Sequence, residues 1–148
     1  MTDIQITSFG YLHGQAPAAH LTADLRQHFR DPHHDPALRA KTGADPQVME
    51  AVLSTDGIAD LIDGLVACVR AYWDGPSAAS RTITVAVGCA GGKHRAHVVA
   101  DELARLLLAD GFDVETVHRD SHRPVVERDA CGRAAQAGPH SGAVQARG

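Results

Sequence analysis

The 148-residue chain has few aromatic residues and little net charge. Phenylalanine, tyrosine and tryptophan make up 4% of it, so the apolar 44% consists mostly of small aliphatic residues, including 25 alanines. A formal net charge of −4 argues against coating of nucleic acid or of an anionic membrane by bulk positive charge, although a local basic pocket is compatible with it. At 15.6 kDa the chain has the size of one domain.

Long apolar runs and paired cysteines are also lacking. No apolar stretch approaches the roughly 20 residues that a membrane span needs. The N-terminus has neither the basic region nor the apolar region of a secretion signal. The three cysteines, Cys68, Cys89 and Cys131, form no C-x-x-C pair, which excludes a disulfide framework or a zinc ribbon. We therefore expect a cytoplasmic protein that has no membrane partner.

Hydrophobic spacing predicts one α/β domain over residues 1–123. Alternating or continuous apolar runs predict strands, and apolar residues at helical spacing predict helices. The strands are expected at 4–9, 21–25, 81–87 and 112–117, and the helices at 46–53, at 56–73 and from the loop after 87 to about 110. Because strand, loop, helix and strand follow one another from 81 to 117, this run predicts a right-handed crossover between parallel strands. The sheet is expected to be mixed or partly parallel.

Two segments carry no periodic pattern. Residues 27–46 are polar, contain three prolines and predict a long loop, and such a loop inside a small domain usually carries function. Residues 124–148 are rich in alanine, glycine and arginine without periodicity, which is typical of a disordered tail.

A glycine-rich, basic loop follows the most strongly predicted strand and precedes a helix. Its adjacent glycines allow backbone N–H groups to converge on a ligand, and the positive end of the helix dipole faces the same place. The basic side chains and glycines of this loop predict an anion site, most simply a phosphate site, whereas a tight turn that glycine merely allows to pack closely is the alternative. The loop comprises Gly88, Cys89, Ala90, Gly91, Gly92, Lys93, His94 and Arg95.

The loop fits neither common nucleotide fingerprint. The Walker A spacing lacks its first glycine, and His94 replaces the hydroxyl that holds magnesium. Cys89 and Arg95 have instead the C-x5-R spacing of cysteine-dependent phosphatases, in which a thiolate at a helix N-terminus attacks phosphorus. Ala96 and Gly88 depart from that pattern, since such enzymes usually carry Ser or Thr and His there.

The loop and several other segments resemble the C-terminal domain of the RNase adapter protein RapZ (YvcJ-like) family. The family's loop reads roughly G-C-T-G-G-x-H-R-S, and residues 88–96 are similar to it except that Ala90 and Ala96 replace Thr and Ser. The resemblance covers about residues 4–123. Further matching segments, in the same order, are Ser8-Phe9-Gly10-Tyr11, Asp24-Leu25-Arg26, Asp31-Pro32-His33, Leu38-Arg39, Thr42-Gly43 and His118-Arg119-Asp120.

This resemblance implies a regulatory binding domain with a fold like a phosphofructokinase subdomain. It implies a small phosphorylated ligand, with an amino-sugar phosphate such as glucosamine-6-phosphate suspected, and self-association as a homodimer or higher oligomer. In some bacteria it also implies an RNA or RNase partner, and in full-length relatives a P-loop kinase-like domain precedes this one. The implied pocket residues are Asp24, Arg26, His33, Cys89, Ala90, Gly91, Gly92, His94 and Arg95.

Further residues are candidates for the same pocket. Lys93 belongs to the basic loop, and His118 and Arg119 end the last predicted strand beside it. Asp24 and Arg26 share one face of a strand, where a simple ion pair is the alternative to ligand contact. The two missing hydroxyls of the family loop weaken phosphate or sugar binding by on the order of 0.5–1.5 kcal/mol each.

The ten histidines raise the possibility of a metal site. A cluster in the long loop could hold zinc or nickel, but its spacing matches no known site, so we expect no metal and no other cofactor. The members of that cluster are His28, Asp31, His33, His34 and Asp35.

Three residues outside the pocket are given structural or neutral roles. His97 is expected at the surface, Cys68 in the core near the apolar stripe of the long helix, and Cys131 without a role.

Two other functions stay open beside the binding domain, for which no catalytic residue is expected. One is a phosphatase that uses Cys89 and Arg95, with Asp24 or Asp120 as general acid. The other is an RNA- or protein-binding adapter that uses the basic loop as a docking point without a small ligand.

Overall fold

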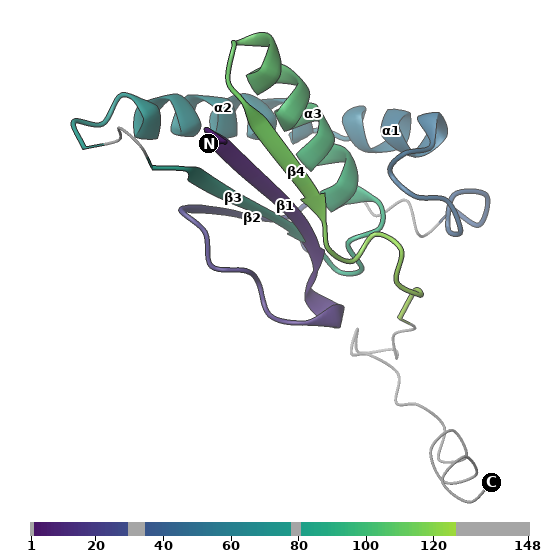
Figure 1. Ribbon diagram of the computed structural model, residues 1–148. Helices are drawn as coiled ribbons and strands as arrows, with labels where there is room; N and C mark the ends of the chain where they lie inside the picture. The colour runs from purple at the N-terminus through teal and green to yellow at the C-terminus, as the bar shows by residue number, and fades with distance from the viewer. Residues whose placement is uncertain (1, 30–34, 78–80, 127–148) are drawn as a thin grey trace, which may run out of the picture.

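A computed structural model describes residues 2–29, 35–77 and 81–126, which form a sheet with helices packed on one face (Figure 1). The strands are β1 (Ile4–Gly10), β2 (Leu21–Asp24), β3 (Ile83–Cys89) and β4 (Val114–His118). The helices are α1 (Pro46–Leu53), α2 (Ile58–Trp73) and α3 (Arg95–Ala109), and a short 3-10 helix, Tyr11–His13, follows β1. Within these ranges no helix is both long enough and apolar enough to cross a lipid bilayer.

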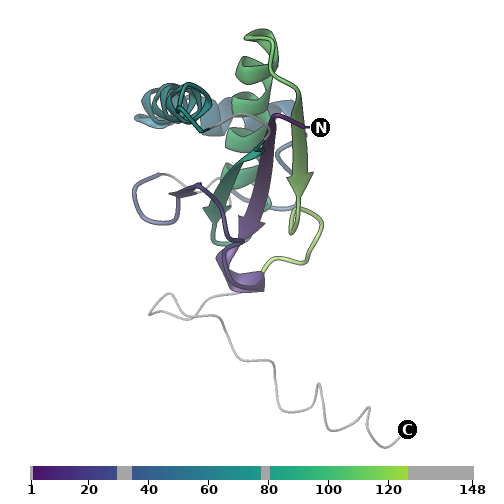
Figure 2. The same cartoon turned by 60° about the vertical axis from the view of Figure 1, so that its left-hand side comes forward.

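The sheet has the order β2-β3-β1-β4, and each of its three strand pairs is parallel. The α/β prediction is therefore confirmed, with a sheet that is parallel throughout. The connections from β2 to β3 and from β3 to β4 step in the same direction across the sheet. Right-handed crossovers in one direction place their helices on one face, and Figure 2 shows α2 and α3 together on that face.

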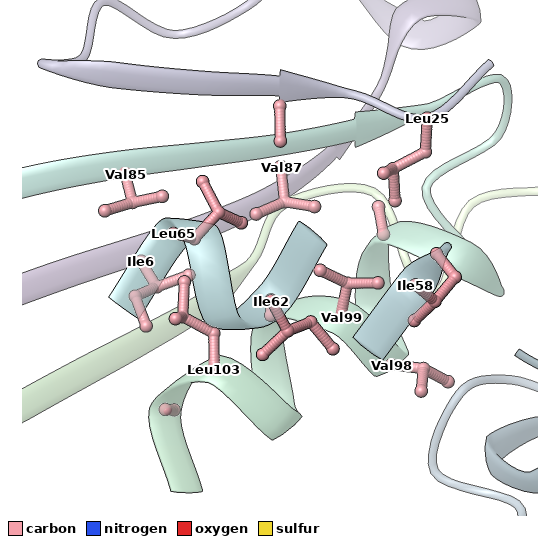
Figure 3. Packing of buried hydrophobic residues seen from close by; sticks show 14 of the residues in the cluster. Ile6, Leu25, Ile58, Ile62, Leu65, Val85, Val87, Val98, Val99 and Leu103 are labelled. Atoms are coloured by element: carbon pink, nitrogen blue, oxygen red, sulfur yellow. The ribbon is translucent and has the colours of Figure 1, made fainter. Parts of the chain in front are cut away.

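The core lies between this face of the sheet and the helices. Alternate residues of β1 and β3, such as Ile6 and Val85, point toward α2 and α3, in the layer that also contains Ile62 and Leu103 (Figure 3). Small and branched side chains fill this layer in place of aromatic ones, as the composition predicts. The tight packing of β3 against α3 fixes where the loop between them emerges.

Local signals explain most of the element boundaries. The carboxylate of Asp45 caps α1 by accepting a hydrogen bond from the Gln47 N–H at 2.9 Å, and Pro46 occupies the first helical position. Helix α2 begins two residues later than predicted because Gly57 has a left-handed φ of +90°. Strand β3 begins two residues later than predicted and extends through Cys89, so Gly88 and Cys89 belong to the strand.

The prediction that Cys68 lies in the core is wrong. The buried stripe of α2 passes through Leu65, Val66 and Val69, and Cys68 lies on the other side of the helix, where it is exposed. The long loop is confirmed for residues 27–29 and 35–45, which contain neither helix nor strand. Cys131 and most of the expected tail, residues 127–148, lie outside the described residues.

Candidate functional site

The carboxyl ends of the four parallel strands meet at one edge of the sheet, the usual place of ligand sites in open parallel sheets. In the register Gly10 lies beside Cys89, Asp24 beside Gly88, and Ser8 beside His118. Segments up to 110 residues apart in sequence therefore converge here. Most of the described candidate residues come to this edge, on the end of β2, on the loop between β3 and α3, and after β4.

The glycine loop folds back onto the end of β1. Gly92 has a φ of +74°, and a Cβ added there would lie 2.7 Å from the backbone nitrogen of Gly10. A Cβ on Gly10 would lie 2.4 Å from the carbonyl carbon of Gly91. These two backbones touch, so that only glycine fits at positions 10 and 92. Gly91 differs, because a Cβ there would meet nothing within 4 Å. Close packing thus explains Gly92 but not Gly91.

Cys89 is buried beneath this loop, with 2% of its surface exposed. Its sulfur accepts hydrogen bonds from the backbone N–H groups of Gly92 at 3.2 Å and Ala96 at 3.4 Å. Ala96 is in the first turn of α3, whose N-cap residue, His94, provides no side-chain cap. The sulfur therefore accepts a hydrogen bond from a backbone N–H in the first turn of α3, where N–H groups have no partner within the helix.

Arg95 is equally buried, and its guanidinium is turned toward backbone rather than solvent. Its Nη1 donates to the carbonyl oxygens of Leu25 at 2.9 Å, Phe29 at 3.1 Å and Arg26 at 3.2 Å. The side chain thereby ties the start of α3 to the segment that follows β2. Through these hydrogen bonds Arg95 holds the segment that carries Arg26 in place.

The neighbouring basic residues also lie within the packed loop. His94 is 4% exposed, and Lys93 is half-buried. The carbonyl of Lys93 accepts a hydrogen bond from the Gly43 N–H at 2.9 Å, which joins the glycine loop to the long loop.

Asp24 and Arg26 form the most open charged pair at this edge. The Arg26 Nη2 lies 2.7 Å from Asp24 Oδ2, and the two side chains are 43% and 41% exposed, Arg26 first. The guanidinium also stacks on the Tyr11 ring, 3.6 Å from its centre. Hydrogen bonds from Arg26 lower the pKa of Asp24, so this carboxyl is ionised at neutral pH. The ion pair is present, and solvent reaches both of its members.

Arg119 and Asp120 brace the other side of the edge. Asp120 is fully buried and accepts hydrogen bonds from the Gly10 N–H at 2.8 Å and from Arg119 at 2.9 Å. Burial alone would raise the pKa of Asp120, but the bonds from Arg119 and Gly10 outweigh burial and lower it. An acid held ionised in this way is poorly suited to donate a proton at neutral pH. Arg119 also donates to the Gln15 carbonyl at 2.6 Å.

His118 faces α3 rather than the glycine loop. Its Nδ1 is hydrogen-bonded to Ser8 Oγ at 2.6 Å, its Nε2 lies 2.7 Å from Asp101 Oδ1, and its ring stacks on His97. The prediction that His97 is a surface residue is wrong. Its turn of α3 packs against Gly43, where a Cβ would lie 2.7 Å from the His97 side chain.

Sequence reasoning missed Tyr11, Ser8 and Asp101 as parts of this edge. Tyr11 carries no local signal, because its contact with Arg26 depends on how the chain leaves β1. The i, i+4 spacing of His97 and Asp101 on a helix is a signal that could have found Asp101. Residues 30–34, which include His33 and most of the expected metal cluster, lie outside the described residues. His28 is exposed.

The surroundings of Cys89 differ from those of a phosphatase nucleophile. A Cβ on Gly88 would lie 2.4 Å from the Phe9 ring and 2.6 Å from the Tyr11 ring, so the histidine usual there has no space. Arg95 is bonded to carbonyls, and both candidate general acids, Asp24 and Asp120, have lowered pKa values. The described residues thus depart from the phosphatase pattern at Gly88, at Arg95 and at both candidate acids.

Comparison with known proteins agrees with the α/β fold. The RapZ C-terminal domain family matches residues 2–122. The chain belongs to this family. Similar proteins include a nucleotide-binding protein of Parafrankia sp. (strain EAN1pec), 43% identical over 119 residues, and one of Thermus thermophilus, 41% identical over 121 residues.

The match to these RapZ-family relatives covers 80% and 81% of this chain but only 41% and 43% of theirs. A nucleotide-binding protein of Kocuria rhizophila, 37% identical over 122 residues, has 40% of its length covered. The name of these relatives thus describes proteins of which this chain spans about two fifths.

Proposed function

We propose that this RapZ C-terminal domain is a ligand-sensing module that binds a small phosphorylated metabolite at the carboxyl edge of its sheet. The observation that carries the proposal is the meeting of the glycine loop, the start of α3 and the Asp24–Arg26 pair at one place. Leu25 N–H donates to the Gly88 carbonyl at 2.7 Å, and Arg95 joins α3 to the same segment. The phosphate would lie over the open side of Gly91, near the helix start.

The charges at this edge favour an amino-sugar phosphate, such as glucosamine-6-phosphate. Arg26 supplies an exposed guanidinium that suits phosphate oxygens. Asp24 supplies an ionised carboxylate beside it, which suits a ligand ammonium or sugar hydroxyls. A zwitterionic ligand can thus replace both halves of the existing ion pair, whereas a plain sugar phosphate replaces only one.

Calorimetric titration with glucosamine-6-phosphate tests the proposal, with fructose-6-phosphate, glucosamine, inorganic phosphate and ATP as comparison ligands. We expect glucosamine-6-phosphate to bind most tightly, and Arg26→Ala to weaken its binding about tenfold or more, since a charged hydrogen bond contributes roughly 1.5–3 kcal/mol. Arg105→Ala is the matched control, because Arg105 forms a similar exposed ion pair with Glu102 on α3. Equal effects of the two substitutions, or no binding of any phosphorylated compound, would contradict the proposal.

A phosphatase is the second candidate, and the two N–H groups directed at the Cys89 sulfur favour it, because such donors stabilise a thiolate. Cys89→Ser separates the two functions. A phosphatase would lose its turnover of a phosphate ester, whereas a sensor would keep its affinity for glucosamine-6-phosphate within a few fold. We expect no turnover by the unmodified chain and near-constant affinity in the variant.

An RNA partner is tested separately by gel shift with a structured RNA. Because the most exposed cation of the proposed site is Arg26, an RNA complex that persists in Arg26→Ala would place RNA on a different face. Loss of both RNA and sugar phosphate in that variant would indicate one shared site.

A further inference from the structure

Three side chains converge on the helix face of the sheet, one turn of α3 beyond the glycine loop. His97 and Asp101 lie four residues apart on α3, and His118 ends β4 opposite them. The Nε2 atoms of His97 and His118 lie 3.1 Å and 2.7 Å from the two carboxylate oxygens of Asp101. The two imidazole rings stack with their centres 3.7 Å apart. Two nitrogen donors and one carboxylate therefore share one small volume.

Each imidazole is oriented from behind by a serine hydroxyl. Nδ1 of His97 is hydrogen-bonded to Ser121 Oγ, and Nδ1 of His118 to Ser8 Oγ, both at 2.6 Å. In metal-ligating histidines a hydrogen-bond partner on the far nitrogen fixes the ring and its tautomer, and here a serine hydroxyl takes that position on each ring. A hydroxyl can both donate and accept. Each serine therefore supports the Nε2–H tautomer facing the carboxylate, and also the Nδ1–H tautomer that leaves Nε2 free for a metal.

The spacing of the donor atoms suits a small divalent ion. The candidate ligand atoms all lie within 4.8 Å of one another. Zinc bonds of 2.0–2.1 Å in a tetrahedron separate neighbouring ligand atoms by about 3.3 Å, so a pair of ligand atoms at the 4.8 Å limit must close by about 1.5 Å. The stacked imidazole rings must also turn so that both Nε2 atoms face the ion. The Asp101 side chain is 47% exposed, so that water or a ligand can take the fourth position.

We propose that His97, Asp101 and His118 form a binding site for a zinc ion, with two imidazole nitrogens and one carboxylate as its protein ligands. On binding, the proton on each Nε2 is lost and Nδ1 of the same ring takes one up, so the imidazoles stay neutral. Imidazole and carboxylate together are ligands that zinc accepts readily, and three protein ligands with one open position resemble the zinc sites of hydrolytic enzymes in donor number. The site does not depend on phosphate binding at the glycine loop.

The paired side chains also explain why the cluster is stable without an ion. Burial alone would raise the pKa of Asp101, but hydrogen bonds from His118 and His97 outweigh it and hold that pKa well below its ordinary value.

The test is calorimetric titration of the metal-free full chain with Zn²⁺ in a non-chelating buffer near neutral pH. We expect a tight site of one ion per chain that Asp101→Asn and His118→Gln weaken at least a hundredfold. Ser121→Ala, which removes only the hydroxyl behind His97, is expected to weaken it 10- to 100-fold. His122→Gln and His28→Gln are matched controls, because both histidines are exposed, and neither should change this site.

Cobalt provides a readout that does not depend on the variants folding. Co²⁺ in the unmodified chain should show the intense visible absorption of four-coordinate cobalt, and Zn²⁺ should displace it. The weak spectrum of hydrated six-coordinate Co²⁺ would overturn the proposal. It would also be overturned if Asp101→Asn, folded by circular dichroism, bound Zn²⁺ as tightly as the unmodified chain, or if the controls weakened binding as much.

Discussion

The buried carboxylate of Asp120 accepts a hydrogen bond from the backbone N–H of Gly10 at 2.8 Å, although 110 residues separate the two in sequence. The bond joins the end of β1 to the segment after β4 and holds Gly10 where Gly92 packs on it. Arg119 and Arg123 pair with the same carboxylate, each at 2.9 Å. One side chain thus joins two segments at the edge where the ligand is proposed to bind.

Asp120→Asn is expected to lower the free energy of unfolding by about 1–3 kcal/mol, because a buried charged acceptor becomes a neutral one while its donors stay in place. Urea denaturation followed by circular dichroism measures the change. Asp110→Asn is the matched control, since Asp110 forms an ion pair with Arg70 that is largely exposed, and such pairs contribute about 1 kcal/mol or less. Equal losses of unfolding free energy in the two variants would show that Asp120 stabilises the fold no more than an exposed ion pair does.

The same carboxylate gives stability a defined dependence on pH. The folded pKa of Asp120 is lowered below its ordinary 3.8. A group whose pKa is lowered on folding stabilises the fold above its unfolded pKa and loses that contribution as pH falls through its folded pKa. We therefore expect the melting temperature of the metal-free chain, measured with a chelator present, to fall below about pH 4. Asp120→Asn should show a shallower decline, and an identical decline would contradict the role of Asp120.

The two loop glycines should respond in opposite ways to the same substitution. Gly92→Ala places a methyl group at a φ of +74° and 2.7 Å from the Gly10 nitrogen. Left-handed strain alone is roughly 1–2 kcal/mol, and the clash adds to it, so we expect a loss of more than about 2 kcal/mol of stability. Gly91→Ala meets no atom within 4 Å and should leave stability unchanged or raise it by up to about 1 kcal/mol.

Thermal melting of both variants measures this contrast, and ligand titration adds a second one. If phosphate lies over the open side of Gly91, the added methyl group should weaken sugar-phosphate binding in a chain that is fully folded. Unchanged affinity in Gly91→Ala would move the ligand away from this side of the loop.

Much of the fold follows from local sequence signals, whereas the roles of the site residues depend on where their side chains point in the folded chain. The capping residue Asp45 and the apolar periodicity of α2 predict helices because both act within one or two turns. The sequence also predicts a basic glycine loop at the right place. It does not predict that Arg95 turns inward, because the three carbonyls that accept its hydrogen bonds lie on a segment about 70 residues earlier.

The same limit explains the errors for single residues. Cys68 and His97 each lie near the edge of an apolar stripe, and which side is covered depends on the neighbouring element. The long loop covers His97 through Gly43, whereas the described part of the chain leaves Cys68 exposed. The hydrophobic periodicity of a helix alone does not show which residues at the edge of its apolar stripe a neighbouring element covers.

Arg95 and Arg26 should separate stability from binding, since both are arginines at the same edge but only one is buried. Arg95→Met leaves the carbonyls of Leu25, Arg26 and Phe29 without the donor that they share. An unsatisfied buried polar group costs about 1–3 kcal/mol, so this variant should lose stability by at least that amount in urea denaturation. Its affinity for a sugar phosphate should then fall indirectly, because the segment that presents Arg26 loses its anchor.

Arg26→Met should show the reverse. Its ion pair with Asp24 is exposed, and such a pair contributes about 1 kcal/mol or less to stability, so urea denaturation should change little while affinity for a sugar phosphate falls about tenfold or more. The comparison is decisive because the substitutions are chemically identical and the sites adjoin. Arg26→Met could instead lose as much stability as Arg95→Met and keep its affinity for a sugar phosphate. In that case the Arg26 guanidinium would stabilise the fold, and ligand binding would depend on the glycine loop alone.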